Sequence, residues 1–465
     1  MAQNILIVSS RANTGGGGEH YILNIVKRID RKRYNPFVAI PGDGTLKAAL
    51  EKLNVEVVQF DSYDYSLAPD KQWYKALSGI ENNLHILTDF IHKNHIKLVH
   101  TNSNIRWEGV LAANLAEVHH IYAIRIDFDP DHYLYKRFKL SLPNFACIMS
   151  TLSTFVLSVS QNCTNSLCPP IPKNKIRTIN NGIDQEHYDT LLNNESHSIR
   201  MELGIPLDST LIIAAGRIVH DKGFDIYTDM AIEVTTAQPT VHFVIAGGHE
   251  DTQLYESLLN KISRSVARDN FHFLGHRNDI KKILVTADIF VLSSRHEGQS
   301  NALLEAMACQ CAVIATRCSG VEDAIINLDS GVIIDVDDLP AMTTAITSLL
   351  DNPDELERYA ASARQRITTN FKIQDKVKEL MQLYDDALAL PLPPKGSPIV
   401  RLFLNATNEI AMLGMKNIEF ERRLQRVEHL ADLIQFNFII RCIRKIRNFL
   451  VNLNIASKPD KNKNN

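Results

Sequence analysis

Two glutamates eight residues apart mark the segment of this sequence with the clearest chemical potential. Glu297 and Glu305 enclose EGQSNALLE, which follows an apolar strand predicted at 289–292 and runs into a helix predicted at 301–309. Free backbone N–H groups at a helix N-terminus bind phosphate, and those of 298–301 are so placed. Glu305 offers two acceptor oxygens to the vicinal hydroxyls of a ribose, and Glu297 can accept hydrogen bonds from a sugar. Taken alone, however, this spacing is more typical of an exposed helix edge.

Two cations follow another predicted strand, at 210–215. Gly216 and Arg217 come straight after it, and Lys222 lies a few residues further on. Two cations beside a glycine at the carboxyl end of a strand suit a diphosphate, which gains negative charge when it leaves a nucleotide-sugar. Losing one preorganised donor at such a group typically costs about 2.7–4 kcal/mol of transition-state stabilisation. The alternative is a solvated surface arginine and lysine.

A glycine cluster, GGGGE at 15–19, follows the first predicted strand at 5–8. Glycines such as Gly16 and Gly17 let a backbone approach an anionic or sugar group closely, and the next helix offers its positive N-terminus. The cluster lacks the G-x-G-x-x-G spacing of dinucleotide-binding folds, which disfavours a nicotinamide dehydrogenase. A flexible turn is the alternative interpretation.

The elements that must position these residues alternate between short apolar runs and helical stretches. This alternation predicts a doubly wound α/β fold, and it restarts after about residue 205. Two Rossmann-like domains facing across a cleft follow, with ligands at the carboxyl ends of the strands. The predicted strands are 5–8, 37–40, 55–60, 97–100, 121–126 and 156–160, then 210–215, 242–246, 271–273, 289–292, 312–315 and 331–334.

Taken together, the motifs resemble the glycosyltransferase family 4 (group 1) enzymes, which have the GT-B fold. The resemblance covers about residues 1–390 and includes the E-x7-E element at Glu297 and Glu305, followed by a family turn at Gly320 and Glu322. Its other elements are GGGGE (15–19), TINNGID (178–184), GRIVHDKG (216–223), IAGG (245–248) and FLGHRNDI (273–280).

The resemblance implies a retaining, metal-independent glycosyltransferase that needs no cofactor. It would move a sugar from a nucleotide-sugar, with UDP- or GDP-sugars favoured, to a glycan or lipid-linked acceptor in cell-surface polysaccharide or glycoconjugate synthesis. By the resemblance Arg217, Lys222 and Glu297 act in catalysis. The implied donor-binding residues are Gly16, Gly17, Gly216, His276, Arg277, Gly298, Gln299, Ser300, Asn301 and Glu305.

The resemblance is less complete on the acceptor side. The segment from His100 to Asn102 has only one histidine, at His100, where the family motif often has two. Arg125 stands where a histidine often lies near the reacting sugar. An arginine there suits an anionic acceptor or sugar. It also sustains an alternative function, a catalytically silent GT-B partner subunit that binds a nucleotide-sugar or another protein. The other motif residues favour the enzyme.

The boundaries predicted are an N-terminal acceptor domain at 1–185, a nucleotide-sugar domain at 186–372, a closing helix at 373–390 and a linker with a basic tail at 391–465. That tail holds 13 Lys and Arg against 6 Asp and Glu, in a chain of 465 residues with a net charge of −3. Within it, 434–453 predicts a basic amphipathic helix, which suits a membrane surface or an acidic protein face.

The chain shows no pattern of a secretory signal or of a membrane-spanning stretch, and its seven cysteines form no C-x-x-C pair. We therefore expect a cytoplasmic protein, peripheral on the inner face of the cell membrane through its tail. No nucleic-acid partner is expected.

Overall fold

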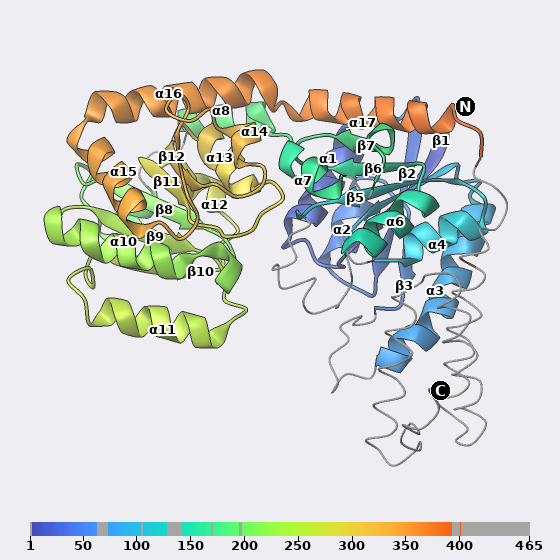
Figure 1. Ribbon diagram of the computed structural model, residues 1–465, viewed down its shortest axis with the longest axis horizontal. Coiled ribbons are helices and arrows are strands. Elements are labelled where there is room, and N and C mark those ends of the chain that lie inside the picture. Colours follow the sequence, from blue (N-terminus) through green and yellow to red (C-terminus); the bar gives the residue numbers. More distant parts are fainter. Residues whose placement is uncertain are drawn as a thin grey trace, which may run out of the picture.

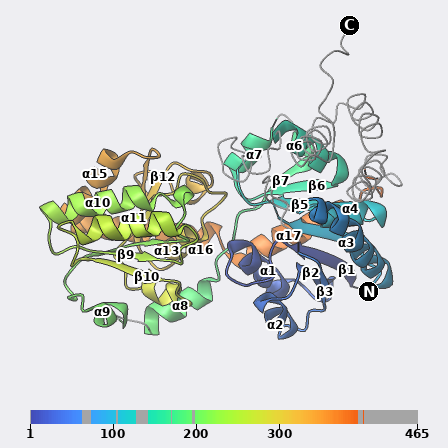
Figure 2. The same cartoon turned by 90° about the horizontal axis from the view of Figure 1, so that it is seen from below.

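The computed structural model describes residues 2–62, 73–103, 106–127, 142–168, 171–194, 198–392 and 400. Within these residues the chain forms two lobes, each built on its own parallel sheet (Figures 1 and 2). The predicted α/β architecture with two sheets is therefore confirmed. The predicted amphipathic helix at 434–453 lies outside the described residues.

The first sheet has seven strands in the order β3-β2-β1-β4-β5-β6-β7. Prediction found six of them and missed β7, a three-residue strand without an apolar run. Ile5 and Ile7 of β1 face one core, and Leu6 and Val8 face the other, so both faces of the sheet are buried. The strands are β1 (Gln3–Ser9), β2 (Tyr34–Pro41), β3 (Val57–Phe60), β4 (Leu98–Asn102), β5 (His119–Ile124), β6 (Phe155–Ser158) and β7 (Ile176–Thr178).

Helices cover both faces of this sheet. One core is closed by α3, α4 and α6, and the opposite core by α1, α2 and the distant α17. The helices of this part are α1 (Gly17–Arg28), α2 (Thr45–Glu51), α3 (Trp73–Lys93), α4 (Glu108–Leu115), α6 (Leu142–Leu152) and α7 (Gln161–Leu167).

The second sheet has six parallel strands in the order β10-β9-β8-β11-β12-β13. Helices α12, α13 and α16 pack on one face, and α10, α11 and α15 on the other. The strands are β8 (Leu211–Ala215), β9 (His242–Ala246), β10 (Phe271–Gly275), β11 (Ile289–Leu292), β12 (Ala312–Thr316) and β13 (Val332–Ile334). The helices are α8 (Gln185–Asn194), α9 (Ser198–Leu203), α10 (Phe224–Ala237), α11 (Thr252–Ser263), α12 (Ile280–Leu284), α13 (Asn301–Ala308), α14 (Val321–Ala324), α15 (Leu339–Asp351) and α16 (Pro353–Asn370).

The chain crosses between the lobes twice, and the two crossings pair with each other. Ile183 donates its backbone N–H to Phe371 O at 2.6 Å and accepts from Ile373 N at 2.9 Å. Beyond this pairing, α17 (Ile373–Leu388) returns to the first lobe, and in Figure 1 α16 and α17 run along one edge of both lobes. The two crossings between the lobes are therefore hydrogen-bonded to each other, and we call this paired segment the hinge.

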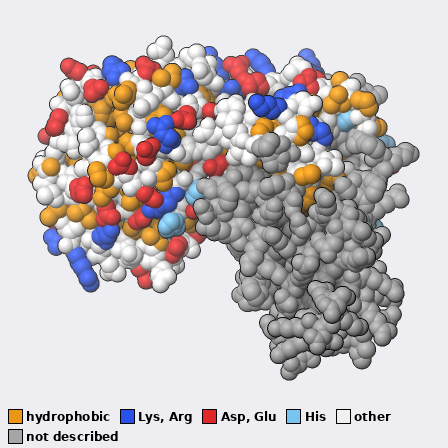
Figure 3. Space-filling view, in the orientation of Figure 1, with side chains coloured by type: hydrophobic (Ala, Val, Ile, Leu, Met, Phe, Trp, Pro, Cys, Tyr) orange, Lys and Arg blue, Asp and Glu red, His pale blue; other side chains and the backbone are white. Residues whose placement is uncertain are grey.

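Acidic and basic side chains intermix on the face of the second lobe shown in Figure 3. Such intermixing is typical of a solvent-exposed surface. Among the described residues, no helix is both long and apolar enough to cross a bilayer.

Candidate active site between the lobes

A cleft of about 530 Å³ separates the carboxyl ends of the two sheets. From the first lobe it receives the glycine loop after β1, the ends of β4 and β5, and the hinge residue Asn181. From the second it receives the loops after β8, β9, β10 and β11. The predicted residues that line it are Gly16, Gly17, Asn102, Arg125, Gly216, Arg217, Lys222, His276, Arg277, Glu297, Gly298, Gln299, Ser300, Asn301 and Glu305.

Lys222 and Glu297 form an ion pair inside the cleft, in which Lys222 Nζ donates to Glu297 Oε1. The side chains are 21% and 11% exposed, and Ser294 Oγ donates to the same carboxylate oxygen at 2.9 Å. A lysine ammonium has three donors and binds phosphate readily as a point charge. A diphosphate entering the cleft would therefore compete with Glu297 for Lys222.

Arg217 is the more accessible cation at the end of β8. Its Nη1 lies 2.5 Å from Glu250 Oε2, and both side chains are about half-exposed. An ion pair at such exposure contributes only about 0–1 kcal/mol, so the guanidinium can exchange Glu250 for a phosphate at little cost.

The glycine after Glu297 allows the two lobes to touch. A Cβ added to Gly298 would lie 1.9 Å from the backbone oxygen of Arg125, across the cleft. Ser300 then caps α13 by accepting from Leu303 N at 3.3 Å. The N-terminus of α13 therefore opens into the cleft opposite the glycine loop, where Gly17 lies close to Asn301 Nδ2. This end of the helix can hold a phosphate.

Asn181, at the hinge, was not among the predicted site residues, but it forms hydrogen bonds with residues that were. Its backbone N–H donates to Gln299 Oε1 at 2.6 Å, and its Nδ2 donates to Asn301 Oδ1 at 2.8 Å. The same side chain accepts from Arg125 Nη1 at 3.3 Å. It therefore ties β5 of the first lobe to the start of α13. The signal for it was its place in the TINNGID motif.

Arg125 and Asn102 meet on the first-lobe side of the cleft. Arg125 Nε donates to Asn102 Oδ1 at 2.8 Å, and its guanidinium carbon lies 3.4 Å from the centre of the Tyr21 ring. Asn102 in turn donates to Gly18 O at 3.0 Å. The guanidinium is thus stacked and oriented within the site rather than extended into solvent.

His100 does not line the cleft, and its predicted contact with the acceptor is corrected. It is fully buried, and its Nδ1 lies 2.7 Å from Tyr384 Oη on α17. Burial, together with the charge of Arg125 and neighbouring His120, holds the pKa of His100 well below its ordinary value. It is a buried core residue that joins the first sheet to α17.

Glu305 projects from α13 into the cleft and into an adjoining cavity of about 290 Å³. Burial raises its pKa, while the charge of Lys281 and the nearby Tyr188 hydroxyl oppose that rise. A half-buried carboxylate beside a phosphate-binding helix N-terminus is well placed to accept two hydroxyl donors.

Arg277 is held by its own lobe. It donates to Glu202 at 2.7 and 3.0 Å and to Asp279 at 2.8 Å twice. Its hydrogen bonds lower the pKa of Asp279. Arg277 therefore shapes the loop that carries His276, and its guanidinium is already committed to two carboxylates.

Two family models match this chain in succession. The model for Glycosyltransferase Family 4 matches residues 15–187, and that for glycosyl transferases group 1 matches residues 195–366. The chain belongs to the family 4, group 1 glycosyltransferases.

Curated relatives of this glycosyltransferase are distant. It is 26% identical over 211 residues to the lipopolysaccharide core mannosyltransferase LpsB of Rhizobium meliloti, covering 44% of this chain and 60% of the relative. It is 24% identical over 368 residues to the N,N'-diacetylbacillosaminyl-diphospho-undecaprenol α-1,3-N-acetylgalactosaminyltransferase of Campylobacter jejuni, covering 76% of this chain and 92% of the relative. The match to the α-maltose-1-phosphate synthase of Mycolicibacterium smegmatis covers 58% of that relative.

Solved structures share the fold. HepE of Anabaena, in complex with UDP, superposes with a TM-score of 0.69 at 18% identity, covering 83% of this chain and all of that one. WaaG, a glycosyltransferase involved in lipopolysaccharide biosynthesis, gives 0.63 at 14% identity over 82% of this chain and 99% of that one. The predicted GT-B fold is confirmed.

Prediction also passed over Glu19 as a site residue, although it ends the GGGGE motif. Glu19 lines the cleft, is 2% exposed and accepts from Ser10 Oγ at 3.2 Å. Burial raises its pKa, whereas hydrogen bonds from its own backbone and the charge of Arg11 oppose the rise. Its carboxylate packs against Gly16 and so fixes the glycine loop of this glycosyltransferase.

Within the described residues, no three His, Cys, Asp or Glu side chains converge as they would around a metal ion.

Proposed function

We propose that this chain is a retaining, metal-independent glycosyltransferase that moves a sugar from a nucleotide-sugar to a glycan or lipid-linked acceptor. Its setting would be cell-surface polysaccharide or glycoconjugate synthesis, in keeping with the names of the Rhizobium and Campylobacter relatives. One observation carries the proposal: the Lys222–Glu297 pair lies beside the N-terminus of α13, in a cleft lined by both lobes.

The donor diphosphate would bind Lys222, Arg217 and the N–H groups that begin α13. Binding to Lys222 releases the Glu297 carboxylate, which then accepts hydrogen bonds from the transferred sugar. Glu305 would take the ribose hydroxyls. Negative charge grows on the diphosphate as it leaves, and these preorganised donors stabilise that charge most in the transition state.

The transfer step would take place on one face of the sugar. The bond between the anomeric carbon and the diphosphate oxygen breaks, and a bond from the acceptor oxygen forms on the same side. The acceptor proton passes to the leaving diphosphate oxygen, so the step needs no basic side chain. Contact between the lobes at Gly298 and Arg125 would exclude water, which otherwise hydrolyses the donor.

A UDP-sugar is the first donor to test, with a GDP-sugar second. HepE, which shares this fold, was solved with UDP and with UDP-glucose. We assign acceptor binding to 1–185, where Arg125 and Asn102 face the cleft, and donor binding to 186–372. Cytoplasmic location, with 434–453 resting on the inner face of the membrane, remains part of this proposal and rests on the basic amphipathic pattern.

The stereochemical and metal claims can be tested together with water as a surrogate acceptor. A purified chain is given the nucleotide-sugar that it hydrolyses fastest, and NMR reads the anomer of the sugar first released. Retention of the donor's configuration, at the same rate with and without a metal chelator, is the expected result. An inverted product would overturn the retaining assignment, and loss of rate in the chelator would overturn metal independence.

A further inference from the structure

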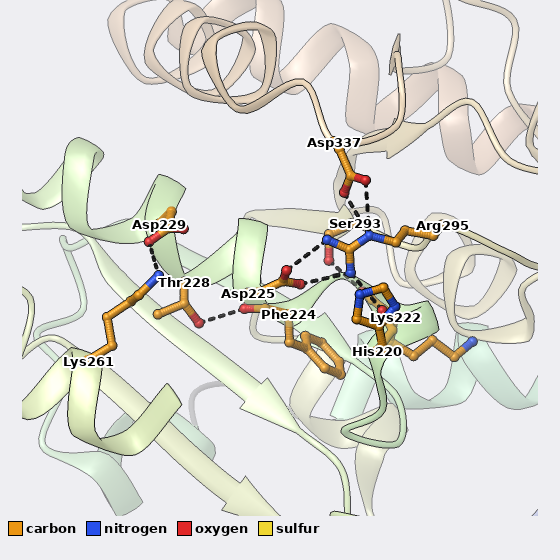
Figure 4. Close-up of polar contacts among 10 residues, drawn as sticks. All are labelled: His220, Lys222, Phe224, Asp225, Thr228, Asp229, Lys261, Ser293, Arg295 and Asp337. Carbon is orange, nitrogen blue, oxygen red and sulfur yellow. Dashed lines mark hydrogen bonds and ion pairs between the residues drawn. The ribbon is translucent and has the colours of Figure 1, made fainter. Parts of the chain in front are cut away.

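Arg295 lies on the loop after β11, two residues before Glu297, and its side chain is only 12% exposed. It is not among the residues that line the cleft. Figure 4 shows its guanidinium pointing away from the end of Lys222 and into a group of acceptors. Nη1 and Nη2 donate to the two carboxylate oxygens of Asp225 at 3.0 and 2.7 Å.

The same guanidinium reaches two further segments. Nη1 also donates to His220 O at 2.7 Å, and Nε lies 2.8 Å from the nearer oxygen of Asp337. One side chain therefore joins the loop after β8, the first turn of α10 and the turn after β13.

Backbone contacts continue this connection as far as Lys222. The Arg295 N–H donates to Asp221 O at 2.7 Å, and Ser293 Oγ donates to Lys222 O at 2.9 Å. Between them Gly223, at φ +61°, approaches so closely that a Cβ would lie 2.0 Å from Ser293 O. The backbone of Lys222 is thus fastened to the loop that carries Glu297.

The contacts in this group favour the charged forms of both Asp225 and Arg295. Burial alone would raise the pKa of Asp225, but the hydrogen bonds and charge of Arg295 lower it overall. Burial also opposes the charged form of Arg295, yet Asp225 and Asp337 together raise its pKa. Planar bidentate pairing of this kind fixes geometry as well as charge.

We propose that Arg295 is a positioning residue, which holds the Lys222 loop against the Glu297 loop so that one donor meets both side chains in register. This inference rests on the proposed function, because it assigns Lys222 to the diphosphate and Glu297 to the sugar. Arg295 would contact neither the diphosphate nor the sugar, and it acts through the backbone of both loops.

The test compares Arg295→Ala and Arg295→Lys with Lys261→Ala. Lys261 pairs with Asp229 at 2.6 Å on the same helix as Asp225, and Figure 4 shows that pair apart from Arg295. Both Arg295 variants should lower kcat with the best donor about 100-fold, the scale of a 1 Å misplacement, with a smaller change in donor KM. Arg295→Lys should not restore kcat, because one ammonium cannot reproduce the planar guanidinium that pairs with two oxygens of Asp225.

Hydrogen exchange of the unliganded protein gives a second readout that does not need turnover. Amides of 220–225 and 293–297 should exchange at least tenfold faster in both Arg295 variants, and not in Lys261→Ala. A fall in melting temperature with wild-type kcat and unchanged exchange in those segments would overturn the inference. If the wild type turns over no donor, the proposed function fails, while the exchange rates still decide whether Arg295 holds the two loops together.

Discussion

At the scale of single residues, the site is a set of charges held ready for exchange. Lys222 forms an ion pair with Glu297, and Arg217 forms one with Glu250. Each cation therefore has a protein carboxylate that a diphosphate would displace. Glu305 differs, because burial dominates its environment and raises its pKa. Its charge state therefore responds to pH nearer to neutrality than that of an ordinary glutamate.

That shift predicts a pH dependence of donor binding. In the proposed function ribose hydroxyls would donate to the Glu305 carboxylate, and the carboxylate is protonated as the pH falls through its raised pKa. Donor KM should therefore rise as the pH is lowered, and the rise should begin at a higher pH than an ordinary glutamate would cause. Glu305→Gln should raise donor KM about tenfold at neutral pH, equivalent to about 1.4 kcal/mol, and abolish most of the pH dependence. A wild-type slope that survives in Glu305→Gln would assign the titration to another group.

At the scale of elements, the loop after β11 meets the end of β5 across the cleft. A methyl group on Gly298 would collide with Arg125 O. Gly298→Ala should therefore reduce sugar transfer about 100-fold or more while each lobe stays folded. Gly204→Ala is the control for a glycine substitution without a collision, since nothing lies within 4 Å of its added Cβ, although its φ of +67° strains the alanine backbone. Equal activity of the two variants, measured as nucleoside diphosphate release, would contradict a role for this contact.

Element positions were largely predictable, because buried parallel strands read as short apolar runs and each chemical motif follows one of them. The E-x7-E segment was found for that reason. Strand β7 was missed because Ile-Arg-Thr carries one apolar residue. The contacts of Asn181 with α13 and the pairing of Arg277 with Glu202 could not be predicted, since each joins residues far apart in the sequence that only folding brings near.

At the scale of the whole molecule, α17 ties the end of the second lobe to the core of the first. The burial of His100 was not foreseen, and its partner Tyr384 on α17 is 284 residues away along the chain. Tyr384→Phe should leave His100 Nδ1 unsatisfied in the core, at a cost of about 1–3 kcal/mol. The melting temperature of the first lobe should then fall by several degrees. Backbone amides of β4 should also exchange hydrogen faster.

Tyr255→Phe is the control for that experiment. Tyr255 stacks on His249 with ring centres 4.4 Å apart, so loss of its hydroxyl should leave the melting temperature within about one degree of wild type. Equal shifts in the two variants would mean that the Tyr384–His100 hydrogen bond does not hold α17 to the first lobe.

The central claim, that the cleft releases a nucleoside diphosphate from a nucleotide-sugar, is tested most directly by one panel. Wild type, Lys222→Ala, Glu297→Ala and the exposed-site control Lys378→Ala are each given UDP-, GDP-, ADP- and dTDP-sugars, and release of the nucleoside diphosphate is measured. We expect one preferred donor, with release about 100- to 1,000-fold slower in Lys222→Ala and Glu297→Ala and unchanged in the control. Release that survives in both site variants, or a wild type that turns over none of the donors, would contradict it.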